Sequence, residues 1–236
     1  SSGSQLPRLR EAVRSLRLAK AIQADGTADP AHQRMVQASG EIVKRNGTIA
    51  VHQAAVNKYI ATVEDPNSPF NIRLLAAQVQ NECIWGTDRN NAAKFGDTDQ
   101  TSLGYVASLV SRISDLLQTP EIMNVIDPPA GVSNVIDEIE KWLQDQDQHV
   151  LRISLKNLTF ANHLREIVVN ILGQTLLTWA RDGAYASAPV VVAVDEAHQF
   201  FDVTVGDEFA STHLNAFDAI AKEGRTNSRW YSSSKY

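Results

Sequence analysis

The feature that most constrains the fold is the uncharged run at residues 189–194, Pro-Val-Val-Val-Ala-Val, which is followed at once by Asp195 and Glu196. Short apolar runs rich in β-branched residues are typical of strands buried on both faces, the usual state in a parallel sheet. Ligand sites of open α/β sheets lie outside the carboxyl ends of such strands. The sequence therefore predicts a parallel sheet with two carboxylates at its ligand-binding edge.

The two acids have the form of a Walker B element. In that role Asp195 supports Mg²⁺ through a bound water, because this ion keeps much of its hydration shell. Glu196 then orients or deprotonates the water that attacks ATP. The structural alternative is a buried strand that ends in two solvated acids. The phosphate-binding motif Gly-x-x-x-x-Gly-Lys-[Ser/Thr] does not occur, so the chain holds half of a site for ATP and Mg²⁺.

Composition limits the possible partners and the compartment. The net charge of −5 over 236 residues gives no general basic surface, so contact with nucleic acid needs a local patch or an assembly. A single cysteine, Cys83, excludes an internal disulfide framework and suits a reducing cytosol. No apolar stretch approaches the ~18 residues of a membrane span, and no secretory signal is present. We expect a cytoplasmic protein with no membrane contact, and the opening Ser-Ser-Gly-Ser indicates part of a longer one.

The order of predicted elements suggests two regions. Apolar spacing predicts helices, and therefore an antiparallel bundle, over residues 6–22, 31–44, 49–63, 70–84 and 101–117. A Pro-Pro turn at 127–131 marks a change of character. Beyond it the pattern predicts helices at 133–143, 162–181 and 208–223, with Gly224 as a C-cap, and strands at 149–155 and 189–194. We therefore predict an α/β fold, with a helical region at 1–127 and a partial α/β region at 128–236.

Other polar residues allow two interpretations each. Arg225, directly after the last predicted helix, either reaches a neighbouring subunit's γ-phosphate or neutralises a helix end. His198 has no second histidine or cysteine at ligand spacing, which argues against a metal site there. Arg10, Arg14 and Arg17 share one helix face that contacts phosphates or solvent, and solvent is favoured because no aromatic residues lie between them for base stacking.

Three segments together resemble the HerA family of hexameric DNA-translocating ATPases, relatives of FtsK. The first runs from residue 150 to 169, and the second runs from 190 to 200 and contains Asp-Glu-Ala-His at 195–198. The third runs from 214 to 225 and ends in Ile-Ala-Lys-Glu-Gly-Arg. The likeness covers about residues 149–225. It implies the carboxyl half of a RecA-like P-loop NTPase core, preceded by an α-helical bundle insertion. The phosphate-binding loop would then lie upstream of the helical region.

The resemblance also implies roles and partners. Asp195 would be the Walker B aspartate, Glu196 the catalytic glutamate and Arg225 the arginine that acts at a subunit interface. The intact protein would be an ATP-dependent DNA translocase or helicase that works as a hexamer in DNA end processing or phage defence, with a nuclease or defence effector as partner. This chain alone is expected to be inactive. The alternative is a non-enzymatic helical module or scaffold that assembles an effector protein.

Overall fold

The computed structural model describes residues 2–145, 147, 149–158, 163–185, 188–200, 203–206, 211–214 and 216–226. The chain forms two compact units, Ser1–Pro128 and Pro129–Tyr236. The first unit holds α1 (Ser2–Ala24), α2 (Pro30–Gln33), α3 (Ile49–Lys58), α4 (Ile60–Glu64), η1 (Ile72–Leu74), α5 (Leu75–Asn81), α6 (Gln100–Leu117) and α7 (Pro120–Ile126). The second holds α8 (Val135–Gln144), α9 (Leu164–Arg181), η3 (Ala197–Gln199), β1 (Val203–Gly206), β2 (Ser211–Leu214) and α10 (Ala216–Thr226).

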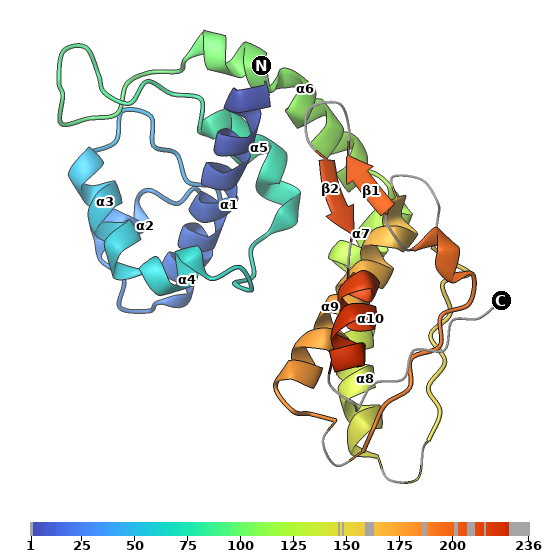
Figure 1. Cartoon of the computed structure of the whole chain (residues 1–236). Coiled ribbons are helices and arrows are strands. Elements are labelled where there is room, and N and C mark those ends of the chain that lie inside the picture. Colours follow the sequence, from blue (N-terminus) through green and yellow to red (C-terminus); the bar gives the residue numbers. More distant parts are fainter. Residues whose placement is uncertain are drawn as a thin grey trace. The chain divides into compact units, whose positions relative to one another are not determined.

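Helix α1 is the central element of the first unit, with α5 beside it (Figure 1). Its apolar residues form two stripes rather than one. One stripe packs with α5 and α6 in a cluster of Ala12, Leu16, Leu75, Val79, Cys83, Val106 and Ile113. The other packs with residues of α3, α4 and two loops in a cluster of Leu18, Ala19, Ile22, Ala28, Ile42, Ala55 and Val63. Because each buried Leu or Ile side chain contributes about 1.5–3 kcal/mol, a helix buried on two sides holds this unit together.

A buried polar network joins α5 to the loop that precedes α3. The Lys44 Nζ lies 2.5 Å from a Glu82 carboxylate oxygen, and the two side chains are 7% and 3% exposed. The Gln78 amide donates to the other Glu82 oxygen over 2.8 Å, and it also bonds both backbone groups of Ile42. Each polar group that this packing removes from water therefore keeps a partner.

Helix α6 confirms the helix predicted at 101–117, and its start has a clear cause. The Asp99 carboxylate accepts the backbone N–H groups of Thr101 and Ser102, which have no partner inside the helix. The Ser102 hydroxyl donates to the same carboxylate, and this hydrogen bond lowers the pKa of Asp99. The helix predicted at 31–44 is wrong beyond α2, because Gly40 takes a φ of +106° in a turn that pairs Val36 with Ile42.

The predicted α/β fold is wrong. The protein is 58% helix and 3% strand, which does not fit the carboxyl half of a RecA-like P-loop NTPase core. Within the described residues the paired strands are β1 and β2, an antiparallel hairpin rather than a parallel sheet. The segments 149–155 and 189–194, predicted as strands, have no regular secondary structure and pair with no described strand. A strand requires a hydrogen-bonded neighbour, which apolar sequence alone does not supply.

In the second unit, α9 packs against α10. Gly173 of α9 allows the close approach, because a Cβ there would lie 3.0 Å from the Ala216 Cβ and 3.1 Å from the Phe217 ring. The Asn170 side-chain oxygen accepts the backbone N–H of Ala216 at the start of α10. Helix α10 runs on to Thr226, so Gly224 is not the C-cap that the sequence predicts.

Candidate functional site

The two predicted acids lie in a turn between the segment 189–194 and η3. Both are exposed, and Glu196 has a φ of +54°, in the left-handed region that glycine favours. A Glu196 carboxylate oxygen lies 3.3 Å from Nδ1 of His198. Non-glycine residues with positive φ are uncommon and cluster at functional sites. The turn thus fixes the backbone that presents these carboxylates.

Asp195 and Glu196 line a cavity of about 690 Å³. The segments 150–156 and 192–196 and helix α9 form its walls, and its lining is more apolar than polar. Lys156 and Arg165 line it as well. The Arg165 Nε donates to the Leu158 carbonyl over 2.6 Å, which ties the loop after residue 155 to α9. Lys156 is exposed and forms no ion pair with any residue that the structure describes.

This arrangement places carboxylates and a free ammonium group around one cavity of ligand size. Mg²⁺ is commonly bound through one or two carboxylates, substrate phosphates and water, so two acids are a sufficient donor set on the protein side. In the described part of the chain, no group of three or more His, Cys, Asp or Glu side chains lies close enough to hold a metal ion by itself. A cation held here would depend on a bound phosphate.

Arg225 lies in the last turns of α10, and its side chain lies outside the described residues. Its neighbour Glu223 bonds Arg181 of α9, with Nε of Arg181 3.0 Å from one carboxylate oxygen. This hydrogen bond lowers the pKa of Glu223. The Ile-Ala-Lys-Glu-Gly-Arg segment is therefore helical, and one of its residues anchors α10 on α9.

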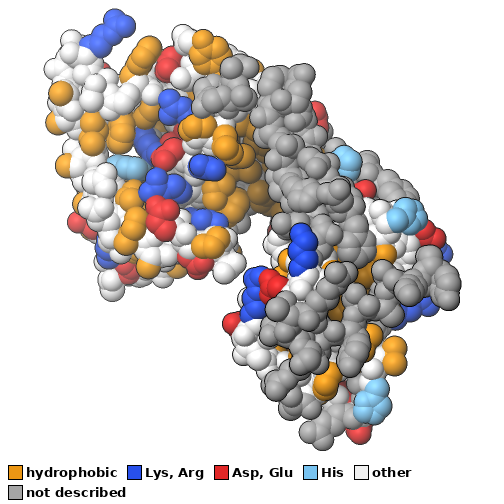
Figure 2. Space-filling model, viewed as in Figure 1, with side chains coloured by type: hydrophobic (Ala, Val, Ile, Leu, Met, Phe, Trp, Pro, Cys, Tyr) orange, Lys and Arg blue, Asp and Glu red, His pale blue; other side chains and the backbone are white. Residues whose placement is uncertain are grey.

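The arginine face predicted on α1 is largely used inside the first unit. Arg14 pairs with Glu11 and with Glu64, at 3.0 Å and 2.6 Å. Arg17 donates to the carbonyl groups of residues 63, 66 and 68. Arg10 is exposed. On the face of the first unit seen in Figure 2, basic and acidic side chains lie interspersed among hydrophobic ones.

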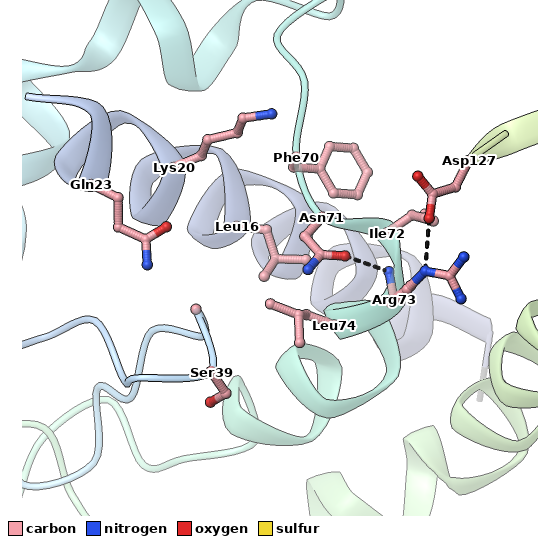
Figure 3. A pocket seen from close by; sticks show the side chains of 11 residues that line it. Leu16, Lys20, Gln23, Ser39, Phe70, Asn71, Ile72, Arg73, Leu74 and Asp127 are labelled. Carbon is pink, nitrogen blue, oxygen red and sulfur yellow. Dashed lines mark hydrogen bonds and ion pairs between the residues drawn. The ribbon is translucent and has the colours of Figure 1, made fainter. Parts of the chain in front are cut away.

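A second cavity, of about 460 Å³, lies in the first unit and was missed by sequence reasoning. Figure 3 shows Lys20 and Gln23 on α1, with Phe70 and Asn71 on the segment that leads into η1. Lys20 and Phe70 are 50 positions apart, so no local pattern joins them. The one available signal was Lys20 close to the predicted arginine face.

His52 lines a small cavity of about 140 Å³ between α1 and α3, together with Glu11, Arg14 and Lys44. Burial lowers the pKa of His52 to about 4, and the positive charge of Lys44 acts in the same direction. The imidazole is therefore uncharged at neutral pH.

Comparison with known protein families, with curated proteins and with solved structures gives no match for this chain. The resemblance to the HerA family accordingly stays a prediction from the three segments. None of the helices in the described part of the chain is long and apolar enough to cross a bilayer.

Proposed function

We propose that residues 195 and 196 form the acidic half of a magnesium–nucleotide site and that the intact protein hydrolyses ATP. The observation that carries this proposal is the position of Asp195, Glu196 and Lys156 around the same cavity of about 690 Å³. Asp195 would hold Mg²⁺, Glu196 would activate the attacking water, and Lys156 would balance phosphate charge. The phosphate-cradling amides that ATP also needs come from outside this sequence or from another subunit.

The local backbone supports this role for Glu196. A glutamate at φ +54° costs on the order of 1 kcal/mol or more compared with an extended conformation. The Glu196 side chain is exposed and lies 3.3 Å from Nδ1 of His198, and the Glu196 carbonyl accepts the backbone N–H of Gln199. A strained, exposed carboxylate at the mouth of a cavity fits a group that is held ready for a ligand better than it fits a structural cap.

The larger assembly follows from the resemblance rather than from the site. A hexameric ring, DNA as the substrate that is moved, a nuclease or defence effector as partner, and a cytoplasmic location are proposals on that basis. Arg225, if it acts in such a ring, does so from the end of α10.

A purified full-length gene product tests the proposal through Glu196→Gln. We expect this variant to lose at least about a hundredfold in ATP turnover while magnesium-dependent ATP binding stays within about threefold, because the change removes the base and keeps the shape. The isolated chain should show no turnover. Glu166→Gln on α9 serves as the matched control. Unchanged turnover in Glu196→Gln would remove the assignment.

A second candidate, a helical interaction module, is favoured by the exposed apolar side chains of the segments 149–155 and 189–194. Val150 is 84% exposed and Val191 is 68% exposed. Exposed apolar side chains mark an interaction site where they form a contiguous patch. A measurement of nucleotide binding distinguishes the ATPase from the interaction module, because an interaction module does not need ATP.

A further inference from the structure

The cavity of the first unit is rich in hydrogen-bond donors. The Lys20 ammonium group is exposed and forms no ion pair within the described part of the chain. The Asn71 side-chain oxygen accepts the Arg73 N–H over 3.1 Å, which leaves its amide nitrogen to donate elsewhere. Gln23 is exposed and turns toward the loop of Ser39 and Gly40 (Figure 3). All three side chains line the cavity, and each of them carries a donor group.

The charge of this region is positive. Asp127, the carboxylate among the lining residues, is occupied by Arg73 over 2.7 Å (Figure 3). Arg17, which lies over the ring of the lining residue Phe70, donates to three backbone carbonyl groups and forms no ion pair within the described part of the chain. Lys20 and Arg17 together therefore attract an anion, although the whole chain carries a net charge of −5.

An aromatic ring completes the set. Phe70 lines the cavity, and the Arg17 guanidinium lies 5.9 Å from the centre of its ring, within the range of a cation–π contact. Phe70 and Lys20 line the same cavity, and Figure 3 shows the ring on the segment that leads into η1. Leu16 and Leu74 add apolar surface to the same cavity. The cavity therefore offers the Phe70 ring to a planar apolar group and the Lys20 ammonium to an anionic group.

We propose that this cavity binds a nucleoside monophosphate unit, with the phosphate on Lys20 and the base against Phe70. Lysine binds phosphate, aromatic side chains stack on bases, and side-chain amides bond base edges. A volume of about 460 Å³ is within the range of ligand cavities. The unit is either one residue of a single strand of nucleic acid or a free nucleotide. This site does not include Asp195 or Glu196, so an experiment can refute either proposal without refuting the other.

Fluorescence anisotropy of the whole chain with labelled oligo-dT of about ten nucleotides tests the proposal. Lys20→Ala should weaken binding about tenfold and reduce the slope of log affinity against log salt by about 0.7, as expected for one lost phosphate contact to a single strand. Lys94→Ala removes the same charge from another exposed position of the first unit. That matched control should change affinity by less than about twofold.

Phe70 gives an independent readout. Phe70→Leu keeps an apolar side chain against the core and removes the stacking surface, so binding should weaken at least about fivefold. Phe70→Tyr should bind like the original chain. Circular dichroism establishes that each variant is folded, and if Phe70→Leu does not fold, the Lys20 and Phe70→Tyr results decide.

Competition with thymidine monophosphate identifies the source of the ligand. If thymidine monophosphate displaces oligo-dT only at a concentration far above that of the oligonucleotide, the ligand is a nucleic-acid strand. If the monophosphate binds directly and Lys20→Ala weakens that binding in the same way, the ligand is a free nucleotide. The proposal is overturned if neither probe binds at millimolar concentration, or if Lys20→Ala and Lys94→Ala bind alike.

Discussion

Lys44→Met tests the buried polar network of the first unit. The substitution removes the partner that lies 2.5 Å from Glu82 and leaves a carboxylate that is 3% exposed. Only the Gln78 amide, at 2.8 Å, then bonds that side chain. Glu11, which lies 3.8 Å from the lysine, is 42% exposed and returns to water without a large cost.

The expected loss follows from the cost of one unpaired buried charge, about 3–5 kcal/mol. With a urea dependence of about 2 kcal/mol per molar, the unfolding midpoint of the first unit should fall by about 2 M. Urea titration followed by far-UV circular dichroism measures this shift. The double substitution Lys44→Met, Glu82→Leu removes both charges and should recover most of the loss, because replacing a buried pair by apolar groups is often nearly neutral.

Lys94→Met, at an exposed lysine, is the control and should leave the midpoint within about 0.3 M, which corresponds to the small effect of most surface substitutions. A midpoint shift of less than about 0.5 M for Lys44→Met would show that the pair is not buried as described. A double variant no more stable than the single one would refute the argument from uncompensated charge.

Three further outcomes are expected. Because the pKa of His52 is lowered to about 4, the unfolded chain binds more protons than the folded chain between pH 4 and 6.5. The free energy of unfolding should therefore fall by up to about 3 kcal/mol as the pH drops through that window. In urea titrations, His52→Asn should flatten this part of the pH profile. Gly40 has a φ of +106°, and a Cβ there would lie 3.0 Å from Leu74, so Gly40→Ala should lower the thermal midpoint by several degrees. Gly104 on α6 has open space around it, so Gly104→Ala should raise the midpoint slightly. Equal effects of the two substitutions would contradict the backbone conformation at Gly40. Glu196→Gly should stabilise the second unit by about 0.5–1 kcal/mol in chemical unfolding while abolishing ATP turnover, and a destabilised variant would argue against strain at this position.

Local signals predicted most of the helices, but the helix predicted at 208–223 is wrong at residues 211–214, which form β2. Helix α6 follows from apolar spacing, and α9 follows from a long amphipathic pattern. The helix prediction at 31–44 was wrong because the apolar residues there fit a turn as well as a helix. The positive φ of Gly40 favours the turn. Periodicity identifies a helix from its own residues, since its hydrogen bonds are local.

The sheet could not be predicted in the same way. Residues 149–155 and 189–194 have the composition of strands, but a strand is defined by a partner strand whose position the local sequence does not give. The acids at 195–196 were found from their place after an apolar run, and they do line a cavity. Lys156 in its wall and the pairing of Phe70 with Lys20 were missed, because these residues meet only through tertiary packing.

The most direct test of the central proposal is a titration of the full-length gene product with a fluorescent ATP analogue, with and without Mg²⁺. The account predicts binding that requires Mg²⁺ and weakens at least about tenfold in Asp195→Asn, a loss of about 1.4 kcal/mol. The Asp182→Asn variant, with its change just after α9, should bind as the original protein does. Equal magnesium-dependent binding by Asp195→Asn, or no binding by the original protein, would contradict the account.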